Sequence, residues 1–130
     1  MKQQVALFTI VVADYDEAIS FYTGKLGFQL LEDTQLSEEK RWVRVAPQGS
    51  NGSAILLAKA ASALQKSAVG NQTGGRVGFF LHTDDFERDY NRLLENGVDV
   101  IRLPETHSYG RVAVFADLYG NLWDLVEPSA

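Results

Sequence analysis

One stretch decides the fold: Val12-Ala13-Asp14-Tyr15-Asp16-Glu17-Ala18-Ile19-Ser20-Phe21-Tyr22, continued by Lys25-Leu26-Gly27-Phe28. The apolar, β-branched run from Val5 to Val12 predicts a strand that ends just before Asp14. Asp14 is followed three residues later by Glu17, which is the pattern of a helix N-cap. Apolar side chains then recur at helical spacing until Gly27, a residue type that commonly ends helices. The stretch therefore predicts a strand followed by an amphipathic helix that lies on a sheet.

The same pattern returns in the second half of the chain. A predicted strand over 77–83 leads to Asp84 and Asp85, and the helix that follows ends at Gly97. Asp85 lies 71 residues after Asp14, whereas Gly97 falls one residue short of that register. Further strands are predicted after each helix, at 28–31, 41–46 and 54–58 in the first half and at 98–102, 111–116 and 122–126 in the second. The predicted fold class is therefore α+β, with two tandem βαβββ modules.

Length and composition bound the organisation of the chain. With 130 residues, of which 45% are hydrophobic, the chain is long enough for one good core and short for two independent domains. We expect a single domain over 1–130, with module one at 1–58, a linker at 59–75 and module two at 76–130. The linker is rich in Ala, Ser and Gly, which predicts a short helix and then a flexible crossing.

Charge and residue usage narrow the partners and the chemistry. The net charge of −5 would repel phosphate backbones, so nucleic acid is not an expected partner. No apolar run approaches the roughly 20 residues that cross a bilayer, and the first residues lack the pattern of a signal peptide. We therefore expect no membrane contact and a cytoplasmic location. Because the chain has no cysteine, a metal ion would need carboxylates and the only two histidines, His82 and His107.

Two motifs resemble the vicinal oxygen chelate superfamily, which includes glyoxalases, bleomycin-resistance proteins and extradiol dioxygenases. The opening stretch is similar to a module start in which a V-x-D turn precedes a helix that carries F-Y and ends on L-G-F. The segment from Phe115 to Leu125 is similar to the closing hairpin F-x-D-P-x-G-N-x-x-E-L, with Leu118 in place of Pro and Asp124 in place of Glu. The resemblance implies that the strands form a cupped mixed sheet, with the helices outside and ligands inside.

The resemblance also implies where metal ligands would lie, on the first and the last strand of each module. These positions fall at Leu7, Gly78, about Ala54, and Asp124. Three of the four have no donor atom, because hydrocarbon or a bare Cα cannot replace the water shell of a divalent cation. We therefore predict no metal and no cofactor, which sets the metal-dependent activities of the family in doubt.

Strand alternation selects the residues that would face the cup. Trp42 and Arg44 share a face if Val43 and Val45 are core, and they suit a planar or anionic ligand. His82 is a candidate base or hydrogen-bond partner, but an ordinary structural histidine has the same pattern. A loop at His107 to Arg111 could close over the cup or could simply be solvated. The predicted ligand-binding residues are Leu7, Thr9, Trp42, Arg44, Phe80, His82, Tyr109, Arg111 and Asp124, of which His82 and Asp124 are candidate catalytic residues.

The leading hypothesis is a metal-free protein that binds a small, partly aromatic or anionic molecule, as drug-resistance members of the family do, and that forms a homodimer. A first alternative is a metal-dependent lyase, isomerase or dioxygenase of the glyoxalase type that uses His82, His107, Asp124 and Glu127. A second alternative is a metal-free acid/base enzyme. A third is a purely interaction-based role. The ligand itself is not encoded in these patterns.

Overall fold

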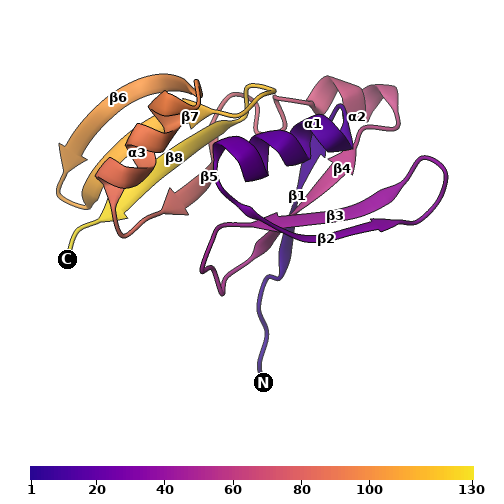
Figure 1. The fold of residues 1–130 in the computed structure, drawn as a ribbon, viewed down its shortest axis with the longest axis horizontal. Helices are drawn as coiled ribbons and strands as arrows, with labels where there is room; N and C mark the ends of the chain where they lie inside the picture. The colour runs from indigo at the N-terminus through magenta and orange to yellow at the C-terminus, as the bar shows by residue number, and fades with distance from the viewer. The chain divides into compact units, whose positions relative to one another are not determined.

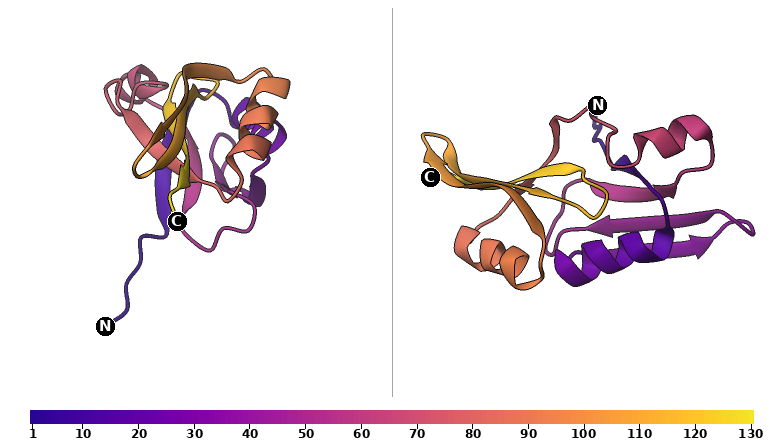
Figure 2. Two further views of the ribbon diagram at one scale, coloured as in Figure 1. Left: turned by 90° about the vertical axis from the view of Figure 1, so that its left-hand side faces the viewer. Right: turned by 90° about the horizontal axis from the view of Figure 1, so that it is seen from above.

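The computed structural model describes residues 1–130, and its contacts divide the chain into two compact units, which we call unit 1 (Met1–Val69) and unit 2 (Gly70–Ala130). In each unit a principal helix lies along one side of a four-stranded mixed sheet (Figure 1; Figure 2). No helix has the length and apolar character that a membrane crossing requires.

Unit 1 follows the predicted βαβββ order. Its elements are β1 (Leu7–Val12), α1 (Tyr15–Ile19), the π-helical segment η1 (Ser20–Lys25), β2 (Gln29–Gln35), β3 (Arg41–Ala46), β4 (Ala54–Lys59) and α2 (Ala63–Ala68). The strand order is β1-β4-β3-β2, in which β1 is parallel to β4 and the other pairs are antiparallel.

Unit 2 repeats the arrangement. Its elements are β5 (Val77–His82), α3 (Phe86–Glu95), β6 (Asp99–His107), β7 (Gly110–Ala116) and β8 (Leu122–Pro128). The strand order β5-β8-β7-β6, with β5 parallel to β8, matches that of unit 1 strand for strand. The predicted fold class, two tandem βαβββ modules, is confirmed. The predicted grouping of both modules into one domain stays a prediction.

The two predicted helix caps are present. Asp14 accepts a hydrogen bond from the backbone N–H of Glu17 at 2.9 Å, and Asp85 accepts one from that of Arg88 at 3.1 Å. Each cap satisfies one of the N–H groups that a helix start leaves without a partner inside the helix.

The first helix departs from the prediction of a regular α-helix up to Gly27. After Ile19 it widens into η1, where the N–H of Leu26 bonds to the carbonyl of Phe21, five residues earlier, at 3.2 Å. Module one has one residue more between its cap and its glycine than module two, and the wider turn accommodates it. Phe21 and Tyr22 are both buried there, with ring centroids 5.2 Å apart.

The predicted loop from His107 to Arg111 is instead a tight hairpin. Strand β6 continues to His107, which pairs with Gly110 at the start of β7, so only Ser108 and Tyr109 form the turn. Gly110 has φ of 144°, and a Cβ there would collide with the carbonyl of Glu127 on β8. The close approach of β7 and β8 therefore requires glycine at this position.

The closing motif of the chain is a structural turn between β7 and β8. The buried carboxylate of Asp117 accepts hydrogen bonds from the backbone N–H groups of Tyr119 and Asn121, both at 2.9 Å, and from the Asn121 side chain at 2.8 Å. Gly120 has φ of 98° in the same turn. These residues hold the start of β8 in place, as turn-forming residue types commonly do.

Candidate functional site

Each sheet has one side that faces its principal helix and one side that we call the far face. In unit 2 the helix side carries Arg111 and Glu127, which both reach Phe86 at the start of α3. Because side chains alternate along a strand, the neighbours of Arg111 and Glu127 along β7 and β8 lie on the far face. In unit 1 Arg41 reaches Asp16 in α1, so the far face of β3 carries Trp42 and Arg44.

A row of four residues crosses the far face of unit 2. Phe80 on β5 is paired with Asp124 on β8, Asp124 with Val114 on β7, and Val114 with Arg102 on β6. Residues directly opposite on neighbouring strands share a face, so the four side chains lie side by side. The next row along the strands consists of His82, Val126, Val112 and Glu105.

The first of these rows places an exposed aromatic ring next to a half-buried carboxylate. Phe80 is 63% exposed, although Val114 in the same row is only 3% exposed. No hydrogen bond or ion pair engages Asp124. Burial raises the pKa of its carboxyl group above the ordinary value, although the charge of Arg102 acts in the opposite direction. The row therefore offers a flat apolar surface and one carboxyl group without a bonded partner.

The corresponding row of unit 1 has a different chemistry. Thr9 on β1 is paired with Leu56 on β4, Leu56 with Arg44 on β3, and Arg44 with Glu32 on β2. The Arg44 Nε donates a hydrogen bond to Glu32 Oε1 at 3.1 Å, so these two charges neutralise each other. Trp42 lies half-buried in the next row, opposite Thr34. Val43 and Val45 are fully buried on the helix side, as the alternation predicted.

The metal-ligand positions of the family do not fit a metal ion here. Leu7 is paired with Ala54, but the matching rows make Leu56, not Ala54, the counterpart of Asp124. This corrects the position expected on β4 and leaves it without a donor atom. A Cβ on Gly78 would lie 2.5 Å from the Cγ2 of Thr73, so Thr73 fills the space into which a ligand side chain would project.

The alternative metal site is also not assembled. Glu127 faces the helix side, where its Oε1 accepts the backbone N–H of Phe86. His107 bonds to Glu105 at 3.0 Å and stacks on Tyr109 at the tip of the β6–β7 hairpin. No group of three or more histidine or acidic side chains is placed to hold a metal ion. The proposed set of His82, His107, Asp124 and Glu127 therefore does not converge.

The remaining sequence-predicted residues divide between the two sides of the sheets. Leu7, Thr9, Phe80 and His82 lie on far faces, together with the residues described above. Arg111 lies on the helix side, where its Nη1 is 2.9 Å from Glu87 Oε1 and its guanidinium carbon is 4.5 Å from the ring centroid of Phe86. Tyr109 is 59% exposed in the hairpin turn. The structure does not bring Tyr109 and Arg111 to the row of Phe80 and Asp124.

The sequence analysis missed Glu32 and Arg102 on these faces, and Thr73, which lies next to Gly78. Glu32 and Arg102 hold the same place on β2 and β6, and 70 residues separate them, which is the internal offset that follows the first helix. That offset was a usable signal. Thr73 lies in the segment read as a linker, where no periodic pattern indicates a contact with Gly78.

Two repeats of βαβββ, with matching rows of side chains across each far face, define a paired-module scaffold of the vicinal oxygen chelate type. The chain belongs to the glyoxalase/bleomycin resistance protein/dioxygenase superfamily, whose model matches residues 4–125.

Similar proteins span nearly the whole chain. An uncharacterized protein of Shewanella frigidimarina is 56% identical over 128 residues, which cover 98% of this chain and 95% of the relative. The crystal structure of TnmS3, an antibiotic binding protein from Streptomyces sp. CB03234, has a TM-score of 0.78 and 35% identity, and the match covers 98% of both chains. The crystal structure of UcmS2 has a TM-score of 0.86 and 30% identity, covering 98% of this chain and 99% of that one.

Proposed function

We propose that this protein binds a compact, partly aromatic or anionic small molecule on its far faces without a metal ion, and that it acts by sequestering that molecule. The observation that carries the proposal is the exposed ring of Phe80 in the row that crosses the far face of unit 2. An exposed aromatic ring with a carboxyl group in the same row offers a planar ligand a surface for stacking and a polar contact beside it. The similarity to TnmS3, an antibiotic binding protein, supports the binding of a small molecule.

The metal-free part of the proposal rests on the donor atoms. Leu7, Leu56 and Gly78 hold positions that would carry ligands in a metal-dependent member, and none of them has a lone pair on its side chain. Binding would depend on stacking and a few polar contacts, which suits sequestration. The residues proposed to contact a ligand are Phe80, His82 and Asp124 on the far face of unit 2, and Leu7, Thr9, Trp42 and Arg44 on the far face of unit 1.

Binding is tested by calorimetric titration with three tricyclic probes of different charge: aminoacridine, acridone and acridine carboxylate. The protein is first treated with EDTA and then titrated again with zinc, manganese, nickel or ferrous ions present. We expect at least one probe to bind the EDTA-treated protein, with no gain from any metal. Binding that requires a metal ion, or no binding of any probe, would overturn the proposal.

A matched pair of variants locates the site. Phe80→Ala should weaken binding about fivefold, because stacking on an aromatic ring contributes on the order of 1 kcal/mol. Phe8→Ala is the control, since Phe8 is also an exposed strand residue, at 54%, but alternates with the far-face residue Thr9. Equal losses in both variants would contradict binding at the far face of unit 2.

A further inference from the structure

We propose that the ligand carries a protonated amine and that Asp124 anchors this amine while the aromatic part of the ligand lies on Phe80. This inference rests on the proposed function and names the class of ligand: a planar aromatic cation. It would distinguish the protein from a binder of neutral or anionic aromatics.

The pairing of Phe80 with Asp124 supplies the geometry. The two residues are directly opposite on the parallel strands β5 and β8, and neighbouring strands lie roughly 5 Å apart. A ring lying on Phe80 therefore brings a substituent at its edge to the carboxylate of Asp124. One small planar molecule suffices to make both contacts.

The second argument is that Asp124 has no bonded partner within the protein. No ion pair includes it, and no hydrogen bond engages its carboxylate. The Arg102 side chain starts two strands away, and Val114 lies between them in the row. A half-buried carboxylate without a partner is costly, and a bound ammonium group would supply the missing donors.

The third argument is the contrast with unit 1. The only arginine in its corresponding row, Arg44, is already neutralised by Glu32, so an anionic ligand would have to displace that carboxylate. The charged group that lies next to an exposed aromatic ring and has no bonded partner is therefore the negative carboxylate of Asp124, beside Phe80. A net charge of −5 for the whole chain also favours the approach of a cation.

The test compares two of the probes, aminoacridine, which is cationic, and acridone, which is neutral. We expect the wild-type protein to bind aminoacridine at least tenfold more tightly than acridone. Asp124→Asn keeps the shape of the side chain and should remove this preference, so that aminoacridine binding weakens about tenfold while acridone binding is unchanged. The circular dichroism spectrum and the melting temperature of the variant check independently that it is folded.

A charge-matched control separates a local contact from the overall field. Glu95→Gln removes one negative charge from the exposed end of α3 and should leave both affinities unchanged. Equal affinity of the wild type for both probes, or an equal loss of aminoacridine binding in Glu95→Gln and Asp124→Asn, would overturn the inference and leave the proposed function standing. If neither probe nor acridine carboxylate binds the wild type, the proposed function itself fails, and the inference fails with it.

Discussion

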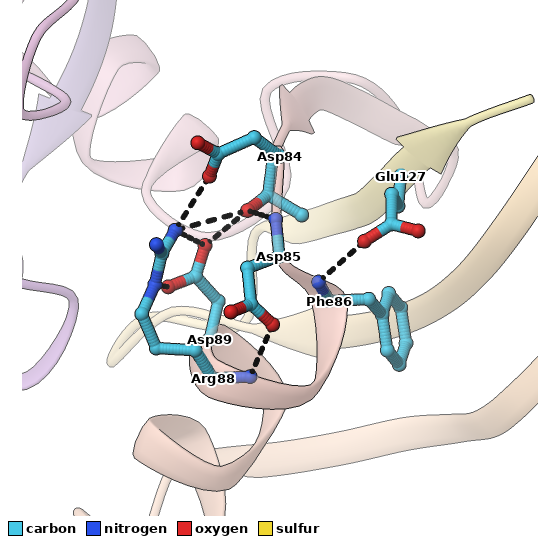
Figure 3. A network of polar contacts seen from close by, with 7 residues as sticks. Asp84, Asp85, Phe86, Arg88, Asp89 and Glu127 are labelled. Carbon is cyan, nitrogen blue, oxygen red and sulfur yellow. Dashed lines mark hydrogen bonds and ion pairs between the residues drawn. The ribbon is translucent and has the colours of Figure 1, made fainter. Parts of the chain in front are cut away.

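The carboxylate of Glu127, near the end of β8, accepts a hydrogen bond from the backbone N–H of Phe86, the first residue of α3, at 2.8 Å (Figure 3). The first N–H groups of a helix have no partner within the helix, and a negative charge near them is favourable. Glu127 thus joins the last strand of unit 2 to the start of its helix, across 41 residues of sequence.

Replacement of Glu127 should therefore lower stability. We expect Glu127→Ala to reduce the free energy of unfolding by about 1–2 kcal/mol, the usual cost of losing a capping interaction. Urea unfolding measures the change. Glu39→Ala, at an exposed turn in unit 1, should leave the stability unchanged. A loss as large for Glu39→Ala would contradict the capping role.

Arg111 should contribute to stability and not to binding. Its contacts with Glu87 and the ring of Phe86 lie on the helix side of the sheet. Arg111→Ala should lower the free energy of unfolding by about 1 kcal/mol, because both contacts are partly exposed. The affinity for the probe that binds the wild type should not change. A weakened affinity with normal stability would place Arg111 at the ligand instead.

The close approach of Thr73 to Gly78 predicts coupling between the two positions. Gly78→Ala should destabilise unit 2 by about 1 kcal/mol, because the new Cβ meets the Thr73 methyl group. Thr73→Ser removes that methyl group and keeps the hydroxyl, which donates to the Arg76 carbonyl at 2.6 Å. The double variant should recover the stability lost in Gly78→Ala. Gly24→Ala is the control, because a Cβ at that position meets no atom within 4 Å. If the effects of Gly78→Ala and Thr73→Ser on stability are simply additive in the double variant, the predicted contact is wrong.

Ionisation of the Asp124 carboxyl group should lower the free energy of unfolding as the pH rises. Its pKa is raised in the folded protein, chiefly by burial and against the charge of Arg102, so the unfolded chain ionises first as the pH increases above the ordinary value of 3.8. Asp124→Asn should equal the wild type in acid and become the more stable protein toward neutral pH. Thermal unfolding of the variant and the wild type across this pH range measures the difference in stability. A variant that is less stable than the wild type at neutral pH would contradict the prediction.

Asp89 provides the opposite case in the same unit. Burial would raise its pKa, but hydrogen bonds from Arg88 and Thr83, together with the charges of Arg88 and Arg92, lower it overall. Figure 3 shows the contact of Arg88 with Asp89. Its contribution to stability is therefore present above the ordinary value and is lost as the pH falls. Asp89→Asn should be less stable than the wild type at neutral pH and equal to it in strong acid, which is the reverse of the effect at Asp124.

Much of the fold could be predicted because its signals are local. The caps at Asp14 and Asp85 depend on residues three positions apart, and the burial of Val43 and Val45 follows from strand alternation. The widening at η1 could not be read from spacing alone, because the same apolar residues suit an α-helix. The one indication in the sequence is that Gly97 falls one residue short of the offset that relates the two helix caps, so the first helix has one residue more than the second.

The candidate site was less predictable because it depends on pairing between strands. Alternation predicted that Phe80 and Trp42 lie on the side of their strands away from the helices, where the structure has them, but it could not show that Glu32 bonds to Arg44. Arg111 was predicted to bind the ligand from the end of a loop that could close over the cup or simply be solvated, whereas its partners Glu87 and Phe86 lie far from it in sequence. Such contacts follow from the register of the sheet and not from the residues next to each position.

The wide turn in η1 also bears on how the two halves of the chain could diverge. Before the helices, 71 residues separate Asp14 from Asp85, and after them 70 separate Gly27 from Gly97. A codon gained or lost inside a regular helix would rotate everything beyond it, but here the widened turn absorbs the difference. Two copies of an ancestral segment can thus drift in length within their helices while their strands continue to present equivalent positions.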